Sequence, residues 1–139
     1  MKLALIGATG LVGQVMRDVL EEFNIPLTAF IPAASARSLG SKVTFRQKTY
    51  TVCSIEQALA ESPDVALFSA GGNVSRQWAP AFARKGCRVI DNSSAWRMDP
   101  DVPLLVPEAN AHVLNAAHRI IANPNCSTIQ LVVALAPLH

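Results

Sequence analysis

One cysteine of this sequence lies in a setting that could make its thiol a nucleophile. Cys126 follows a short apolar run, residues 119–122, and precedes an apolar segment with helical periodicity, residues 129–135. Ser127 and Gln130 have the Ser-x-x-Gln spacing that opens a helix, so Cys126 is expected just before or within a first helical turn. Unpaired backbone N–H groups and the positive end of the helix dipole favour a thiolate there. Cys126 is therefore the candidate catalytic residue.

The other two cysteines have the pattern of buried structural residues. Cys53 and Cys87 each lie within or beside an apolar run of strand length. Three widely spaced cysteines predict neither a disulfide framework nor a metal site. This use of cysteine favours a reducing compartment, so we expect the protein in the cytoplasm.

A glycine-rich turn near the start could bind a dinucleotide. It lies between an expected strand, residues 2–6, and an expected helix, residues 11–23. Glycines at every third position would let the backbone approach a pyrophosphate at the helix N-terminus. A tight turn that only packs helix against strand is the alternative interpretation. The candidate cofactor-binding residues of this turn are Gly7, Thr9, Gly10, Leu11, Val12 and Gly13.

The loop after the second expected strand, residues 27–31, indicates which dinucleotide would bind. An acidic residue at the end of that strand would hold the ribose hydroxyls of NAD, and none is present. Ser35, Arg37 and Ser38 instead supply a cation and hydroxyls, which suit the 2′-phosphate of NADP. The alternative is an ordinary solvated loop arginine. With the glycine turn beside it, the loop favours NADP as cofactor.

The elements that must position these residues alternate between strand and helix. Further strands are expected at residues 64–69, 87–90 and 119–122, and a capping box at Ser54 and Gln57 predicts a short helix through residue 60. Short strands at 43–45 and 49–52, a helix at 74–86 and a weak helix at 112–116 complete the pattern. This alternation predicts an α/β fold, a Rossmann-like doubly wound and mainly parallel sheet.

Ligands of such sheets bind beyond the carboxyl ends of the strands. The glycine turn, residues 69–72, residues 91–97 and the turn at Cys126 each follow an expected strand, so they should gather along one edge. Arg97 in that setting would suit a phosphate or a carboxylate. Asp91, Glu108, His112 and His118 could serve as acids or bases, but nothing in the sequence places them near Cys126.

The composition and net charge of the chain limit the kinds of partner that it can bind. The chain of 139 residues suits one domain, and its net charge of +2 with no long basic run argues against nucleic acid or an anionic membrane. The apolar run at residues 3–6 is too short for a signal peptide, and no segment is long enough to span a bilayer. Half of the residues are hydrophobic, which fits a sheet buried on both faces or a face meant for a partner or a further domain.

Six blocks of the sequence together resemble the cofactor-binding half of an aspartate-β-semialdehyde dehydrogenase. They occur in the family's order and span nearly the whole chain: residues 7–13, 34–38, 69–72, 91–97, 107–110 and 123–130. The block with Arg97 and the block with Cys126 are the specific ones. The departures are Trp96 where Phe is usual, Ala109 where Val is usual, and an unusual Ile-Pro pair before the arginine loop.

The resemblance implies a reversible, NADP-dependent reductive dephosphorylation of β-aspartyl phosphate to aspartate semialdehyde, in the biosynthesis of lysine through diaminopimelate, threonine and methionine. Cys126 would attack the acyl phosphate and carry a thioester, which NADPH would reduce. By motif position, Arg97 would bind the phosphate and Asn125 would orient the reacting groups. Ser69 and Gly71 would contact the cofactor.

Members of this family continue into a second domain that carries the catalytic histidine and most of the dimer interface. We therefore expect residues 1–139 to be an NADP-binding domain that ends at the catalytic-cysteine helix, without that second domain and with little or no turnover alone. The full-length protein would be a homodimer. Two alternatives are a non-catalytic NADP-binding module and an N-acetyl-γ-glutamyl-phosphate reductase, whose cysteine turn differs from this one.

Overall fold

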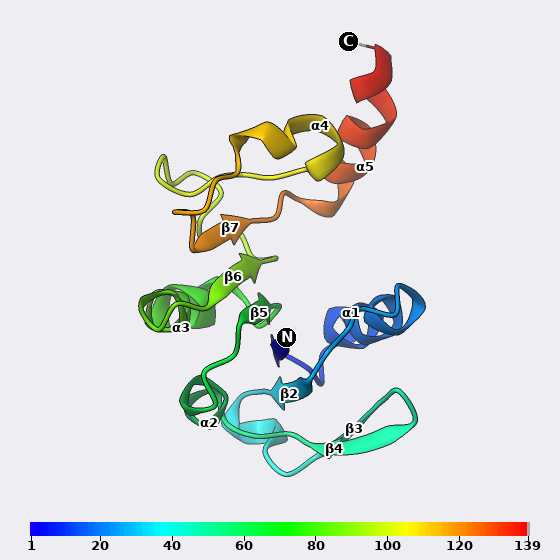
Figure 1. Ribbon diagram of the computed structural model, residues 1–139, viewed down its shortest axis with the longest axis vertical. Coiled ribbons are helices and arrows are strands. Elements are labelled where there is room, and N and C mark those ends of the chain that lie inside the picture. The colour runs from blue at the N-terminus through cyan, green and yellow to red at the C-terminus, as the bar shows by residue number, and fades with distance from the viewer. Residues whose placement is uncertain (139) are drawn as a thin grey trace.

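Within residues 1–138, the part of the chain that the computed structural model describes, five parallel strands form one sheet in the order β2-β1-β5-β6-β7 (Figure 1). Helices alternate with the strands and cover both faces, which confirms the expected Rossmann-like α/β fold. The elements are β1 (Lys2–Ile6), α1 (Leu11–Glu22), β2 (Ala29–Ala33), β3 (Lys42–Phe45), β4 (Lys48–Thr51), α2 (Ile55–Ala60), β5 (Val65–Phe68), α3 (Gly72–Arg84), β6 (Arg88–Asp91), α4 (Pro107–Asn110), β7 (Ile120–Ala122) and α5 (Cys126–Leu135).

The five strands end level with one another. Their last residues are paired in one row across the sheet: Ala33, Ile6, Phe68, Asp91 and Ala122. The next residue in each chain segment therefore begins a turn at the same edge. This register confirms that the glycine turn, the arginine loop and the segments after β5, β6 and β7 leave the sheet together.

The core has two layers because β1 is buried on both faces. Leu3 and Leu5 point to the side covered by α1, while Ala4 and Ile6 point to the side of α2 and α3. Figure 1 shows α1 on one side of the sheet and α2 with α3 on the other. Near-continuous apolar strands are typical of parallel sheets with helices on both faces.

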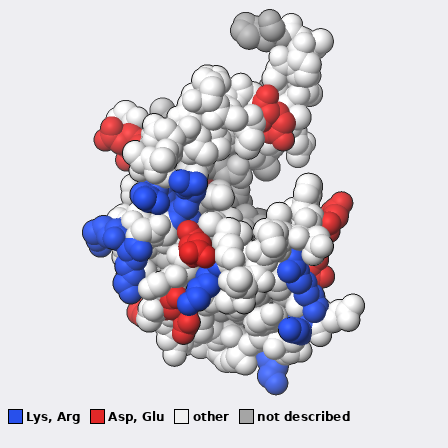
Figure 2. Space-filling model, in the orientation of Figure 1, with Lys and Arg blue, Asp and Glu red and all other residues white. Residues whose placement is uncertain are grey.

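One apolar region remains open to solvent. Ile90, on β6, is 37% exposed although its strand has a neighbour on each side. Helix α5 extends away from the sheet (Figure 1), and Leu131 and Leu135 on it are exposed. Figure 2 shows that the part of this face formed by α4 and α5 carries few charged residues, while Lys, Arg, Asp and Glu are interspersed lower down. The hydrophobic excess of the sequence therefore includes surface residues.

Two expected elements differ from the observed ones. The second strand is displaced by two residues and contains Pro32, which an edge strand tolerates because its N–H side need not pair. The helix expected at 112–116 is wrong: α4 begins at Pro107, and a 3-10 turn, Ala111–Val113, follows. Proline at the first helical position starts that helix earlier. None of the helices within residues 1–138 is long and apolar enough to cross a bilayer.

Candidate functional site

Cys126 is the first residue of α5, as its sequence context indicated. The residue that caps this helix is Asn125, whose side chain accepts a hydrogen bond from the N–H of Ser127 at 3.0 Å. The expected helix-opening box at Ser127 and Gln130 is therefore wrong. Asn125 has extended backbone angles and precedes the first turn, while Ser127 already lies within it.

Of the three cysteines, Cys126 alone is exposed. Its Sγ lies 3.8 Å from Oδ1 of Asn125. Burial raises the pKa of the half-buried Cys53 thiol. Burial, with the nearby charge of Asp64, raises the pKa of Cys87 to about 12. Accessibility therefore separates the candidate nucleophile from the two structural cysteines.

Arg97 is tied directly to the turn that precedes Cys126. Its Nε donates to the backbone oxygen of Asn123 at 3.0 Å, and its Nη2 donates to the backbone oxygen of Asn92 at 3.2 Å. Asn123 also donates through Nδ2 to Oδ1 of Asn92 at 2.7 Å. The structure thus joins the loop that carries Arg97 to the turn that precedes Cys126. No role was expected for these two asparagines, although each directly follows a strand.

The described hydrogen bonds link none of the candidate acids and bases to the sulfur of Cys126. Asp91 is 1% exposed, and its carboxylate accepts hydrogen bonds from Ser75 and Ser93. Nδ1 of His118 accepts from the N–H of Asn115. Among the hydrogen bonds of residues 1–138, none joins a histidine to Cys126.

Packing alone explains two of the three glycines in the turn before α1. A Cβ on Gly7 would lie 2.3 Å from the oxygen of Ser69, and a Cβ on Gly13 would lie 2.3 Å from the oxygen of Gly7. Gly7 also has φ of +92°, which favours glycine. Gly10 is different, because its Cβ would meet only Gly7 oxygen at 3.4 Å. Helix–strand packing, the alternative interpretation, therefore accounts for Gly7 and Gly13 but leaves Gly10 open.

The start of α1 presents unpaired donors. Gly10 is its N-cap, and no side chain caps this helix. No described residue accepts a hydrogen bond from the N–H groups of Leu11, Val12 or Gly13. Thr9 is exposed beside them. Such a group of N–H donors at the N-terminus of a twelve-residue helix can bind an anion.

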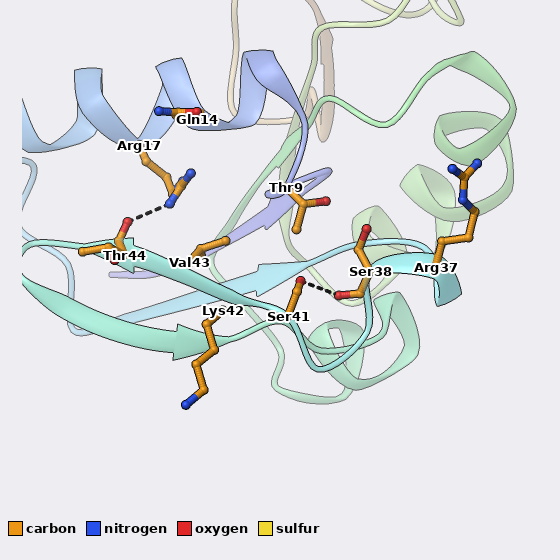
Figure 3. A pocket seen from close by; sticks show the side chains of 9 residues that line it. All are labelled: Thr9, Gln14, Arg17, Arg37, Ser38, Ser41, Lys42, Val43 and Thr44. Atoms are coloured by element: carbon orange, nitrogen blue, oxygen red, sulfur yellow. Dashed lines mark hydrogen bonds between the residues drawn. The ribbon is translucent and has the colours of Figure 1, made fainter.

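A polar cavity of about 580 Å³ lies between this turn, the 3-10 turn at Ala36–Ser38 and β3. Figure 3 shows Thr9 and Ser38 facing it, with Arg17 held by the backbone oxygen of Thr44 at 2.7 Å. The exposed Arg37 points away from the β3–β4 hairpin in this view. The lining residues are Thr9, Gln14, Arg17, Arg37, Ser38, Ser41, Lys42, Val43 and Thr44.

The other loop residues face different surroundings. Ser35 lines a second cavity of about 270 Å³, whose apolar sides include Leu39, Val74 and Trp78. Ser35 thus lines a different cavity from Arg37 and Ser38. Gly71 has φ of +86° and is the N-cap of α3. Ser69 packs against Gly7, so the segment after β5 lies directly beneath the glycine turn.

The sequence missed the residues that the hairpin and α1 add to the larger cavity. Arg17, Ser41, Lys42 and Thr44 contribute to it. Arg17 and Thr44 are 27 positions apart and meet only because β3 packs beside α1. The one available signal was that Arg17 lies on the polar side of the helix after the glycine turn. Within residues 1–138, no three His, Cys, Asp or Glu side chains gather as a metal site.

These features define a dinucleotide-binding domain of the Rossmann-like α/β class. A family model described as "Semialdehyde dehydrogenase, NAD binding domain" matches residues 2–117. The chain belongs to this family, which confirms the resemblance seen in its sequence blocks.

Named relatives agree with this assignment. The aspartate-semialdehyde dehydrogenase of Aquifex aeolicus is 53% identical over 141 residues, which cover 99% of this chain and 42% of that protein. The enzyme of the same name from Corynebacterium glutamicum is 52% identical and has 41% of its length covered. The chain therefore spans about two fifths of the length of these curated relatives.

Solved structures give the same result. Aspartate semialdehyde dehydrogenase II of Vibrio cholerae, complexed with ASA, matches with a TM-score of 0.93 and 46% identity, covering 99% of this chain and 45% of that one. The Candida albicans enzyme, solved with NADP, matches with a TM-score of 0.76 and 28% identity, covering 99% of this chain and 46% of that one.

Proposed function

We propose that this chain is the NADP-binding and cysteine-bearing part of an aspartate-semialdehyde dehydrogenase. The reaction is the reversible conversion of β-aspartyl phosphate to aspartate semialdehyde, in amino-acid biosynthesis in the cytoplasm. One observation carries this proposal: Arg97 is bonded to the turn that leads into the exposed Cys126, and that turn leaves the same sheet edge as the glycine turn. A nucleophile, an anion-binding cation and a pyrophosphate-type turn therefore share one edge.

We assign a separate role in the covalent chemistry to Cys126, Arg97 and Asn125. The thiolate of Cys126 attacks the acyl carbon, the carbon–oxygen bond to phosphate breaks, and a thioester remains on the sulfur. Arg97 holds the phosphate as it leaves. Asn125 uses Oδ1 to cap α5, which leaves its Nδ2 group to donate to the substrate carbonyl. In the reverse direction, phosphate attacks the thioester and frees the sulfur.

The residues around the glycine turn fit NADP. The unpaired N–H groups at the start of α1 suit the pyrophosphate, and Gly10 leaves room for it to approach. Arg37 and Ser38, with Thr9 across the cavity, suit the 2′-phosphate. Ser35, Ser69 and Gly71 are proposed to contact the cofactor from the neighbouring segments. When bound, NADPH supplies the hydride that reduces the thioester.

The remaining parts of the machinery are proposed to lie outside residues 1–139. The chain spans 42% of the Aquifex aeolicus relative, and the described hydrogen bonds bring no histidine to Cys126. We therefore expect the general base and the homodimer interface in the rest of the relatives' length. Residues 1–139 alone should bind NADP and turn over substrate slowly or not at all.

Cofactor binding tests the first half of this proposal. Arg37→Ala should weaken NADPH binding about tenfold or more, as expected for loss of a charge-assisted hydrogen bond, and change NADH binding less than about twofold. Lys42→Ala is the matched control, because Lys42 is an exposed cation on the same cavity. Equal losses for the two cofactors would remove the 2′-phosphate assignment.

An activity assay tests the catalytic part of the proposal. Protein expressed from the complete reading frame is assayed with aspartate semialdehyde, NADP and phosphate, and Cys126→Ser should abolish NADPH formation. NADPH binding without turnover would instead favour a non-catalytic binding module. Turnover only with the N-acetyl-γ-glutamyl semialdehyde would favour the related reductase.

A further inference from the structure

The loop that carries Arg97 is built around one buried carboxylate. Asp91 ends β6 and is 1% exposed. Its Oδ2 accepts from the hydroxyl of Ser75 at 2.9 Å and from the hydroxyl of Ser93 at 2.6 Å. Its Oδ1 accepts from the N–H of Ser93 at 3.1 Å. A buried charge is tolerated where its oxygens are hydrogen-bonded in this way.

Each series of hydrogen bonds runs from an N–H group that can only donate, through a serine hydroxyl, to a carboxylate that accepts. The indole Nε1–H of Trp96 donates to Oγ of Ser75 at 2.8 Å, and the Ser75 hydroxyl in turn donates its proton to the carboxylate of Asp91. The N–H of Ala95 donates to Oγ of Ser93 at 3.1 Å, and the Ser93 hydroxyl likewise donates its proton to Asp91. Both series of hydrogen bonds end on Oδ2 of Asp91, which accepts from the two hydroxyls.

These bonds hold the loop at its first, third, fifth and sixth residues, immediately before Arg97. Arg97 then uses Nε and Nη2, which lie along one side of its guanidinium, on the two asparagine carbonyls described above. Among the described residues, none accepts a hydrogen bond from Nη1. The end of the guanidinium fork thus stays available for a bidentate anion, while its side is anchored.

We propose that Asp91 is a positioning residue that fixes the Arg97 loop through Ser75, Ser93 and Trp96, so that the open end of the guanidinium presents a rigid phosphate site beside the cysteine turn. Asp91 itself is buried and touches no substrate. This inference rests on the proposed function for its ligand, phosphate. Its structural half, the immobilised Arg97, can be measured without any turnover.

Asp91→Asn is the direct test, because an amide has the same shape but keeps only one acceptor oxygen where the carboxylate accepts three hydrogen bonds on two. Asp101→Asn is the matched control, because it removes one acidic charge at an exposed position. In protein from the complete reading frame, the KM for phosphate should rise about tenfold or more, as expected when a charged group loses its pre-organised geometry, with the KM for NADP within about twofold. Unchanged phosphate KM, or equal rises in both constants, would overturn the proposal.

A second measurement uses residues 1–139 themselves and needs no activity. The Nε–H of Arg97 should exchange with solvent more slowly than that of the exposed Arg37 in arginine-detected NMR, and Asp91→Asn should remove this difference. Should Asp91→Asn not fold, Ser93→Ala should give the same two effects and Ser93→Thr, which keeps the hydroxyl, should restore them. An unchanged Arg97 signal in a folded variant overturns the inference. Absence of wild-type turnover alone would instead count against the proposed function.

Discussion

A Cβ atom on Gly13 would lie 2.3 Å from the backbone oxygen of Gly7, within the same turn. This distance is far below van der Waals contact. The atom in the way belongs to the backbone, so it cannot move aside as a flexible side chain could. The first turn of α1 can therefore lie against the end of β1 only without a side chain at Gly13. The same turn contains Gly10, at which a Cβ would meet no such obstacle.

These two glycines should respond differently to alanine. Gly13→Ala should lower the free energy of unfolding by about 1–3 kcal/mol, as for an overpacked core position. Gly10→Ala should cost less than about 1 kcal/mol, because φ of −77° and ψ of 164° suit any residue at an N-cap. Urea denaturation measures both changes.

Cofactor binding then separates packing from function. Folded Gly10→Ala should bind NADPH more weakly than the wild type, because the added methyl group occupies the approach of the pyrophosphate. A large stability loss in Gly10→Ala would assign this glycine to packing, and unchanged NADPH binding would remove its proposed role in cofactor binding.

Two identical sequence patterns had different outcomes, and the difference is physical. The Ser54–Gln57 pair forms the expected reciprocal capping box, with hydrogen bonds of 3.2 and 2.9 Å. The Ser127–Gln130 pair does not, because Asn125 offers an equally good cap two residues earlier. Spacing alone cannot decide between two competing caps. The cysteine's place in the first turn was nevertheless predicted correctly, since both caps put it there or just before it.

The parts of the site that the sequence could not supply are those made by tertiary packing. The alternation of strands and helices, the parallel sheet and its shared edge followed from apolar periodicity and the rule for parallel sheets. The contact of Arg17 with Thr44 and the link from Arg97 to Asn123 join residues 27 and 26 positions apart. No local pattern encodes such pairs, because either side chain would look like a solvated surface residue.

Removing the side chain that caps α5 should lower the free energy of unfolding. Asn125→Ala should lower the free energy of unfolding by about 1 kcal/mol, the usual cost of losing an N-cap side chain. Ser127→Ala should change it by less than about 0.5 kcal/mol, because its hydroxyl does not cap the helix. Chemical denaturation of the two variants side by side gives the comparison. Equal losses would restore the Ser127 box as the helix start.

The three cysteines should react in a fixed order. Near neutral pH, iodoacetamide should modify the exposed Cys126 first and the half-buried Cys53, whose thiol pKa is raised by burial, later. Cys87 should react only after unfolding, because burial raises its pKa to about 12. Mass spectrometry of timed samples follows each site. Simultaneous labelling of all three would contradict the exposure that distinguishes Cys126.

The raised pKa of Cys87 also predicts how stability depends on pH. Its folded-state pKa of about 12 exceeds the ordinary value of 9.0, so the folded state favours the neutral thiol. That contribution is fully present below pH 9.0 and is lost as the pH rises from there toward 12. Cys87→Ala should therefore flatten the alkaline part of the stability curve. A wild-type curve that stays level above pH 9.0 would contradict this assignment.

Arg17 and Arg37 both line the larger cavity, but we expect one to matter for stability and the other for NADPH binding. Arg17 is half-buried and donates to Thr44, so Arg17→Ala should cost about 1 kcal/mol of stability, the net value of one such hydrogen bond. Arg37 is exposed, so Arg37→Ala should change stability by less than about 0.5 kcal/mol. NADPH binding should show the reverse order, because Arg37 is free to turn toward the 2′-phosphate while Arg17 is committed to the β3–β4 hairpin. Thermal unfolding and NADPH titration of the two variants measure both orders. If Arg17→Ala weakens NADPH binding more than Arg37→Ala does, the 2′-phosphate contact belongs to α1 and not to the loop after β2.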